Sequence, residues 1–453
     1  MLNFSTQRIR KLLGATQCGD DATIHGISID TRTIQKNNLF VAINGENFDG
    51  QQFIPAAHQQ GAAAVLSSQP STENITQLVV DDPCQALGKI TQHWRQQFDL
   101  PIVGITGSCG KTTTKQMLGT ILQQAGDTLI TPGNFNNFYG VPLTLAQLNG
   151  QHHYAVIEMG ADRPGEIKYL SQLVQAEIAI VTNIAPVHLD VGNGNGFGTI
   201  DSILQEKTQL FHSLPTDGVA IINADDPLIS SWAKQSLQHR SISFGIEHQA
   251  DITAHNLKAN TNMQYSFDLL TPKGNIAITL ASLGYHNVLN AMAASAAAIA
   301  LDLSLEHIKQ GLAEVQPITR RLMQYRGINN ALIIDDSYNA NSKSVNAVID
   351  MLAHYSGQRI MVLGDMLEIG EQSMAQHRNV GETAKRLGIE RLLTYGQDSQ
   401  HASQLFGKGG QHFTEKNLLI DALKAYLAPH TTVMIKGSHG MHMDKIVQAL
   451  IKK

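Results

Sequence analysis

The chain has 453 residues, of which 42% are hydrophobic and 16% are charged, and its formal net charge at pH 7 is −5. This length suggests about three domains, each large enough to bury a core. The slightly acidic balance argues against a nucleic-acid-binding protein, which would carry a strong basic excess. The cysteines are too few and too scattered for a disulfide framework or a zinc site: Cys18, Cys84 and Cys109.

The sequence also argues against secretion and membrane insertion. Residues 1–17 contain no continuous apolar run of the kind that forms a signal peptide. No apolar stretch is long enough to cross a bilayer, and the alanine-rich run 291–300 is better explained as a tightly packed buried helix. We therefore expect a protein without a transmembrane segment that works in the reducing cytoplasm.

Residues 1–97 are expected to form a small α/β domain. Short apolar runs predict its strands: 27–32, 38–43, 62–66 and 78–80. Residues 53–61 predict a helix that ends at a glycine. The polar groups at the strand ends are Asp30, Thr31, Arg32, Asp49 and Gly50. An arginine at a strand edge suits a phosphate group, but the spacing alone favours a surface salt bridge and a turn.

Residues 101–115, PIVGITGSCGKTTTK, are the most informative stretch of the chain. The apolar run 102–105 predicts a buried strand, and the apolar residues between 117 and 122 fall at helical spacing. The loop between strand and helix contains Gly107 and Gly110. Such a loop lets backbone N–H groups converge on an anion, and the helix N-terminus adds partial positive charge. The stretch therefore predicts a phosphate-binding loop.

Two side chains of this loop carry the expected chemistry. Lys111 would contact the β- and γ-phosphates of a nucleotide, and the Thr112 hydroxyl would coordinate Mg²⁺. Ile105 stands where the longer general pattern has its first glycine, so the loop is a shorter form. A short glycine turn could also be an ordinary tight turn, but the flanking strand and helix favour nucleotide binding.

Residues 98–318 are expected to form the domain built around this loop. Apolar runs predict its strands: 102–105, 155–157, 178–181, 220–222 and 241–244. Helical stretches between several of them predict a mostly parallel sheet, whose ligands lie at the carboxyl ends of the strands. Glu158 directly follows one strand and would be the second Mg²⁺ anchor. His188 follows the next strand along the chain, although a lone histidine is more often structural. Lys207 falls in a predicted helix, where spacing alone indicates a solvated lysine.

Residues 319–453 repeat the pattern of a strand followed by polar residues or glycine. Four apolar runs predict strands: 332–334, 360–363, 392–395 and 433–435. Helices fit between these runs, so we expect a Rossmann-like α/β domain. The segment contains no G-x-G-x-x-G motif, and a dinucleotide cofactor is therefore not supported.

Eight motifs in this order resemble the Mur ligases of peptidoglycan synthesis, and the resemblance spans all three predicted domains. They are TGSCGKTT (106–113), GNFNNFYGVPLTL (133–145), EMGADRPGEI (158–167), TNIAPVHL (182–189), NADD (223–226), GYHNVLNAMAA (284–294), DDSYNANS (335–342) and VLGDMLEIG (362–370). Each motif is weak alone, but their order is specific. EMGA and DDSYNAN favour the branch that adds D-alanyl-D-alanine over the branch that adds the third peptide residue.

The resemblance implies an ATP-dependent ligase that acts on small molecules in cytoplasmic cell-wall synthesis. We also expect the chain to be a monomer. The terminal carboxylate of UDP-N-acetylmuramoyl-tripeptide would take the γ-phosphate of ATP, and the amine of D-alanyl-D-alanine would attack the acyl phosphate. Positioning, lysine and Mg²⁺ would supply most of the catalysis. A ligase that adds a single amino acid, such as the third-residue Mur ligase or folylpolyglutamate synthase, is the nearest alternative. A P-loop ATPase that switches shape is a more distant one.

The resemblance also implies roles for individual residues. Lys111 would bind phosphate, Thr112 and Glu158 would bind one Mg²⁺, and His188 would help to bind a second. Lys207 matches the family's carbamylated lysine, whose added carboxylate would hold that second metal. This role conflicts with the interpretation from spacing, which indicates a solvated lysine. The implied nucleotide contacts are Gly107, Ser108, Cys109, Gly110, Lys111, Thr112, Thr113, Asn287, Asn290, Arg321 and Asp336. The implied substrate contacts are Asp30, Thr31, Arg32, Asp49, Gly50, Asn136 and Asn137.

Overall fold

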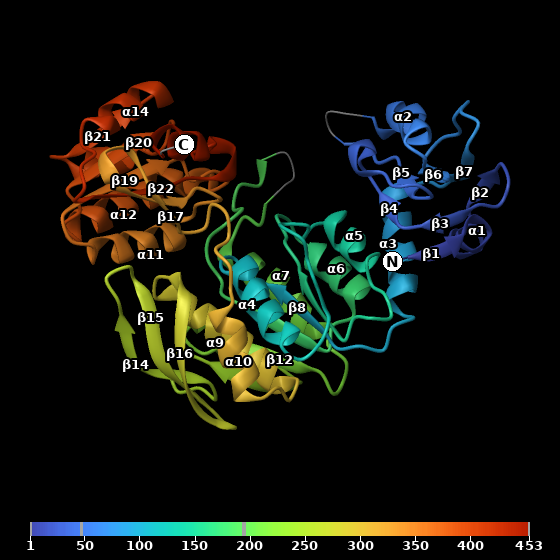
Figure 1. The fold of residues 1–453 in the computed structure, drawn as a ribbon, viewed down its shortest axis with the longest axis horizontal. Helices are drawn as coiled ribbons and strands as arrows, with labels where there is room; N and C mark the ends of the chain where they lie inside the picture. Colours follow the sequence, from blue (N-terminus) through green and yellow to red (C-terminus); the bar gives the residue numbers. More distant parts are fainter. Residues whose placement is uncertain (1, 46–48, 193–195, 452–453) are drawn as a thin grey trace.

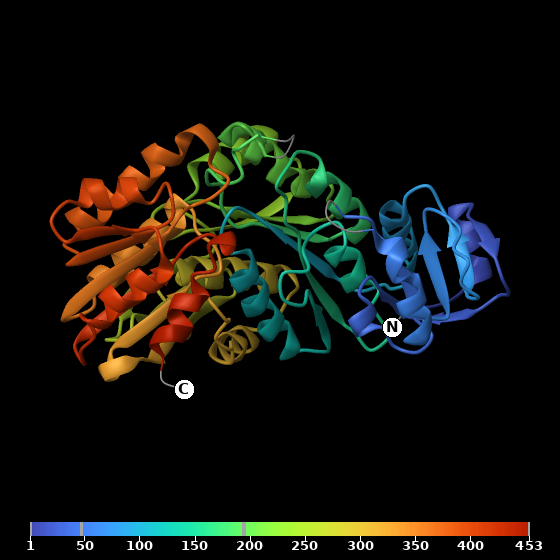
Figure 2. The same ribbon diagram turned by 90° about the horizontal axis from the view of Figure 1, so that it is seen from above.

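The structure, a computed structural model, describes residues 2–45, 49–192 and 196–451. Three α/β units follow one another along the chain, and the first and last lie on opposite sides of the middle one (Figures 1 and 2). We refer to β1–α3 as the N-terminal unit, β8–α10 as the central unit and β17–α15 as the C-terminal unit. The predicted three-part α/β fold is confirmed. None of the helices in the described ranges is long and apolar enough to cross a membrane.

The N-terminal unit contains a five-stranded sheet in the order β2-β7-β6-β5-β4 and a separate antiparallel pair, β1 with β3. The strands are β1 (Asn3–Ser5), β2 (Thr16–Cys18), β3 (Thr23–His25), β4 (Ile27–Ser28), β5 (Leu39–Val41), β6 (Ala64–Ser67) and β7 (Thr76–Val79), and the helices are α1 (Thr6–Leu13), α2 (Ile54–Gln59) and α3 (Pro83–Arg95). Helix α3 also contacts the central unit, because Trp94 Nε1 donates to Leu148 O at 3.0 Å and Arg95 Nε donates to Val174 O at 3.0 Å. These bonds anchor the N-terminal unit.

The strand predicted over 27–32 is too long. Strand β4 ends at Ser28, and Thr31–Thr33 form a 3₁₀ turn instead. The cause is local, because the Asp30 side chain accepts a hydrogen bond from Arg32 N at 2.9 Å and caps the turn.

The central unit is built on a six-stranded parallel sheet in the order β13-β12-β11-β8-β10-β9. Its strands are β8 (Ile102–Thr106), β9 (Thr128–Ile130), β10 (Tyr154–Glu158), β11 (Ile178–Val181), β12 (Val219–Asn223) and β13 (Arg240–Phe244). Continuous apolar runs form the inner strands because helices cover both faces of the sheet. One face packs against α4 (Lys111–Gln123), α9 (His286–Ala300) and α10 (Leu305–Ala313). The other packs against α5 (Gly140–Leu145), α6 (Glu166–Val174), α7 (Ile200–His212) and α8 (Pro227–Ser236).

Two features of this unit test the sequence interpretation. Helix α9 is buried along almost its whole length, as the alanine-rich run predicts.

The unit also contains a three-stranded antiparallel sheet that the sequence did not predict: β14 (Thr253–Ala259), β15 (Gln264–Thr271) and β16 (Gly274–Leu283). It extends the central unit beside α9 and α10 (Figure 1), and alternating residues such as Ile278 and Leu280 join their core.

The C-terminal unit is a six-stranded sheet in the order β17-β18-β22-β19-β20-β21, with only β17 antiparallel to its neighbour. The strands are β17 (Met323–Arg326), β18 (Leu332–Asp336), β19 (Gln358–Gly364), β20 (Arg391–Tyr395), β21 (Gly410–Phe413) and β22 (Thr431–Lys436). The helices are α11 (Ser342–Ala353), α12 (Ser373–Arg386), α13 (Gln400–Phe406), α14 (Lys416–Lys424) and α15 (Asp444–Leu450). The carboxyl end of β18 contributes Asp336 to the cavity described next.

Candidate active site

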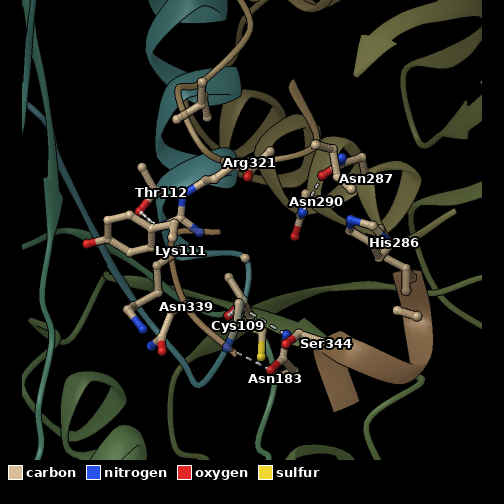
Figure 3. A pocket seen from close by; sticks show the side chains of 18 of the residues that line it. Cys109, Lys111, Thr112, Asn183, His286, Asn287, Asn290, Arg321, Asn339 and Ser344 are labelled. Carbon is tan, nitrogen blue, oxygen red and sulfur yellow. Dashed lines mark hydrogen bonds between the residues drawn. The ribbon is translucent and has the colours of Figure 1, made fainter. Parts of the chain in front are cut away.

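A cavity of about 770 Å³ lies between the central and C-terminal units. Its wall includes the phosphate-binding loop, the carboxyl ends of β10 and β11, the start of α9, residues 321–324, residues between 336 and 348, and Lys436. Figure 3 shows Lys111, Asn290 and Arg321 around this cavity. The volume falls within the range of about 300–1,000 Å³ that is usual for small-molecule sites. Residues far apart in the sequence therefore line one site.

The phosphate-binding loop joins β8 to α4. Gly107 and Gly110 have φ angles of +140° and +82°, which residues with a side chain rarely adopt. The loop is tied to the segment after β11, because Ser108 N donates to Asn183 O at 2.9 Å and Cys109 N donates to Asn183 Oδ1 at 3.1 Å. The first turn of α4 follows directly, so its backbone N–H groups open toward the cavity.

Replacing Gly107 by alanine should weaken nucleotide binding about tenfold or more, because a strained backbone conformation costs about 1–3 kcal/mol. A Cβ at this position would also lie 2.0 Å from Thr182 Oγ1, so the loop must shift. Gly165→Ala is the matched control, since its φ is +93° but a Cβ there meets nothing within 4 Å. Calorimetric titration with ADP, together with thermal melting, measures both variants. Unchanged ADP affinity in Gly107→Ala would contradict the prediction.

Lys111 and Thr112 begin helix α4 at the cavity wall. Lys111 Nζ donates to Gly107 O at 2.6 Å, and burial lowers the pKa of this ammonium while the nearby Glu158 carboxylate opposes the shift. Thr112 Oγ1 donates to Glu158 Oε1 at 3.2 Å and accepts from Arg321 Nη2 at 3.0 Å. The Arg321 guanidinium stacks 4.2 Å from the centroid of the Tyr338 ring. A side chain that precedes the C-terminal sheet thus contacts the phosphate-binding loop.

Glu158 is held by a buried ion pair that the sequence analysis missed. The side chains of Glu158 and Lys115 are 1% and 2% exposed, and Lys115 Nζ lies 3.2 Å from Glu158 Oε2. Lys115 Nζ also donates to Gly133 O at 2.7 Å, and Asn136 Nδ2 donates to Glu158 Oε1 at 2.8 Å. Lys115 lies four residues after Lys111, so the two lysines lie on the same side of α4. This spacing is the sequence signal that could have indicated a second lysine near the site.

The residues around Glu158 fit a Mg²⁺ ion. Thr112 Oγ1 and Glu158 Oε1 are 3.2 Å apart, and adjacent ligands of an octahedral Mg²⁺ with bonds of about 2.1 Å are separated by about 3 Å. Among the described residues, no group of three or more His, Cys, Asp or Glu side chains is placed so that it could hold a metal ion. A Mg²⁺ here would therefore complete its shell with water and phosphate oxygens, as is usual for this ion.

Lys207 is buried, so the interpretation from spacing as a solvated surface lysine is wrong. Its side chain on α7 packs inward, where Nζ donates to Ala161 O at 3.1 Å and lies 5.4 Å from the Phe197 ring centroid. Burial, and then the charge of Lys111, lowers the pKa of Lys207 to about 7. Ala161 lines the cavity, so the Lys207 amine lies just behind the cavity wall. Helical spacing could not show this, because the segments that cover Lys207 come from elsewhere in the chain.

The remaining nucleotide residues of the prediction also meet at the cavity. Asn287 and Asn290 lie one turn apart on α9, where Asn290 Nδ2 donates to Asn287 Oδ1 at 2.8 Å. Asp336 forms an ion pair with Lys436 and accepts from Leu322 N at 3.2 Å. The predicted nucleotide residues that line the cavity are Ser108, Cys109, Gly110, Lys111, Thr112, Thr113, Asn287, Asn290, Arg321 and Asp336. The cavity residues that the prediction omitted include Asn183, His286, Tyr338, Asn341, Lys343 and Lys436.

Most of the predicted substrate residues lie elsewhere. Asp30 and Arg32 form the surface salt bridge that spacing favours, at 2.6 Å, with the Arg32 side chain 87% exposed. Asp49 caps a 3₁₀ turn by accepting from Gln51 N at 2.9 Å, and Asn137 Oδ1 accepts from Gly140 N at 2.9 Å at the start of α5. Of the seven predicted substrate residues, Asn136 alone is among the residues that line the cavity. The substrate roles therefore stay predictions.

Known proteins share the three-unit organisation of this chain and the segments that form its cavity. The Mur ligase middle domain matches residues 105–298, the Mur ligase glutamate ligase domain matches 320–439, and the Mur ligase family catalytic domain matches 23–95. The UDP-N-acetylmuramoyl-tripeptide–D-alanyl-D-alanine ligase of Escherichia coli (strain K12) is 38% identical over 99% of both chains. The chain belongs to the Mur ligase family. The corresponding Haemophilus influenzae ligase is also 38% identical, over 100% of this chain and 99% of its own length.

Solved Mur ligase structures share the whole fold. MurF from Acinetobacter baumannii superposes with a TM-score of 0.93 at 33% identity, covering 100% of both chains. MurF ligase from Thermotoga maritima, solved in complex with ADP, superposes with a TM-score of 0.83 at 23% identity and covers 94% of this chain and 96% of its own. The second match supports the fold alone. The family assignment and the arrangement of three units therefore agree over the full chain.

Proposed function

We propose that this chain is the ATP-dependent ligase that joins D-alanyl-D-alanine to UDP-N-acetylmuramoyl-tripeptide in peptidoglycan synthesis. The observation that carries the proposal is the single cavity in which a phosphate-binding loop and Glu158 meet residues of the C-terminal unit. Relatives with this activity that match along the full length support it. The alternatives, a ligase for single amino acids and an ATPase switch, have less support.

The reaction proceeds in two transfers. One oxygen of the tripeptide's terminal carboxylate attacks the γ-phosphorus of ATP, the bond from that phosphorus to the bridging oxygen breaks, and ADP leaves. The amine of the dipeptide then attacks the acyl carbon, the tetrahedral adduct expels inorganic phosphate, and the nitrogen loses a proton. Negative charge gathers on phosphoryl oxygens, where the Lys111 ammonium, the Arg321 guanidinium and the N–H groups of α4 can stabilise it.

We propose further that Thr112 and Glu158 hold one Mg²⁺, and that His188 and a carbamylated Lys207 hold a second. Mg²⁺ would neutralise charge on the phosphates and orient them. Lys115 and Asn136 keep the Glu158 carboxylate in place for this role. Carbamylation requires a neutral amine, and burial of Lys207, with its pKa near 7, supports that requirement.

Several broader properties belong to the same proposal. We place the reaction in the cytoplasm, with the chain acting as a monomer on small molecules and with domain boundaries near 97/98 and 318/319. Because the product is a wall precursor, loss of activity would affect cell shape, the cell cycle and cell division. We also propose that the N-terminal unit binds the UDP-sugar part of the substrate through Asp30–Arg32 and Asp49–Gly50.

Phosphate release with ATP and Mg²⁺ tests the reaction, with UDP-N-acetylmuramoyl-tripeptide and D-alanyl-D-alanine added separately and together. We expect release only when both are present, with one dipeptide joined per phosphate. Joining of a single amino acid instead of the dipeptide would favour a third-residue ligase or a folylpolyglutamate synthase. Release that neither substrate changes would favour the ATPase switch.

A further inference from the structure

Two short segments from different units meet at the edge of the cavity. One is 188–190, which follows β11 in the central unit, and the other is 366–370, which follows β19 in the C-terminal unit. Leu189 N and Asp190 N donate to Glu368 O at 2.9 and 3.2 Å. The Glu368 carboxylate also bonds to His188 Nδ1. Glu368 therefore makes three separate contacts with three consecutive residues of the other unit.

The backbone on both sides of this contact is unusual. His188 and Glu368 have φ angles of 50° and 64°, in the left-handed region that residues other than glycine seldom adopt. Such a conformation is unfavourable for a residue with a side chain and persists only where surrounding contacts impose it. Both residues adopt this strained backbone conformation, and their side chains bond to each other. The contact between the two segments therefore holds both residues in one specific arrangement.

The chemistry of the pair determines which histidine nitrogen remains available. A carboxylate can only accept a hydrogen bond, so Nδ1 of His188 carries the proton. Nε2 lies on the opposite side of the ring from Nδ1 and carries the lone pair in the neutral imidazole, and His188 lines the cavity. Histidines that bind metals typically have this arrangement, with a carboxylate on the second ring nitrogen.

A solvent-exposed ion pair is the simpler explanation. The Glu368 side chain is 63% exposed, and ion pairs at such exposed positions contribute little to stability. That explanation accounts for the side-chain bond, but it does not account for the two backbone bonds to Glu368 O. It also does not account for the strained conformations or for the position of His188 in the cavity wall.

We propose that Glu368 is a positioning residue for the ligation, which holds His188 from the C-terminal unit with Nε2 available to the cavity. This part of the site is then complete only when the central and C-terminal units are apposed. The inference rests on the proposed function and deepens it, because it names the group that orients the predicted histidine ligand. It assigns no contact between Glu368 and substrate.

The test compares Glu368→Ala, Glu368→Gln, His188→Ala and the double variant His188→Ala/Glu368→Ala in the full chain. Glu368→Ala should lower kcat about tenfold or more, as losses of such supporting carboxylates do, with the KM values of ATP and dipeptide within about twofold of wild type. Glu368→Gln keeps an acceptor for Nδ1–H and should recover most of the activity. The double variant should be no worse than His188→Ala alone, because the two residues act as one unit. Glu371→Ala, an exposed residue nearby, should match wild type.

A second readout does not depend on turnover. Electron paramagnetic resonance with Mn²⁺ and ADP should show weaker Mn²⁺ binding in Glu368→Ala than in Glu371→Ala. Wild-type kcat and Mn²⁺ affinity in Glu368→Ala, or a double variant whose loss is the product of the two single losses, would overturn the inference. Failure of the wild type to join the dipeptide would overturn the proposed function instead, and the Mn²⁺ titration would still decide the role of Glu368.

Discussion

Glu158→Gln should lower kcat about 1,000-fold and destabilise the fold by about 3 kcal/mol. Activity falls because the amide is a poor replacement for a carboxylate as a Mg²⁺ ligand beside Thr112. Stability falls because Lys115, 2% exposed, loses the carboxylate with which it forms an ion pair. Burying an unpaired charge costs more than the pair contributes. Steady-state kinetics and denaturant unfolding measure the two effects separately.

The double variant Lys115→Met/Glu158→Gln separates catalysis from stability. It removes both buried charges and fills the space of the lysine with an apolar chain of similar length, so its free energy of unfolding should return to within about 1 kcal/mol of wild type. Its activity should stay as low as that of Glu158→Gln. Glu158→Gln with more than a tenth of wild-type kcat would exclude the predicted metal role. A double variant as unstable as the single one would exclude the ion pair as the cause.

Lys207→Met should lower kcat about 100-fold or more, with little loss of stability, because methionine fits the buried site without a charge. The physical reason is the predicted carbamate, which forms when a neutral amine adds to CO₂ and releases a proton. Burial lowers the pKa of Lys207 to about 7. The neutral fraction therefore increases as the pH rises through 7, so CO₂-depleted enzyme should recover more activity with bicarbonate at pH 8 than at pH 6.

The carbamate can also be observed directly. Wild-type protein supplied with ¹³C-bicarbonate should give a carbamate signal by NMR that Lys207→Met lacks. Lys168→Met replaces an exposed lysine on α6 and should keep both the signal and full activity. An active Lys207→Met enzyme, or a wild-type enzyme without the signal and indifferent to bicarbonate, would contradict the assignment.

Features encoded in short segments could be predicted well. The strand, glycine loop and helix at 102–123 follow from residues that are neighbours in the chain, and so do the continuous apolar strands of the central sheet. Helix α9 was predicted from its alanine-rich composition. The antiparallel sheet β14–β16 was missed, although alternation in β16 was a signal, because its apolar side is recognisable only against the helices it covers.

The phosphate-binding loop, the parallel sheets and, through the order of its motifs, the family can all be predicted from the amino-acid sequence. The ion pairs could be identified only from the folded chain: Lys115 pairs with Glu158, 43 positions away, and His188 pairs with Glu368, 180 positions away. The folded chain also shows that Lys207 is buried. Backbone conformation depends mainly on adjacent residues, whereas the charge and reactivity of a side chain depend on the groups and the solvent around it. Those surroundings come from distant segments that meet only when the chain folds.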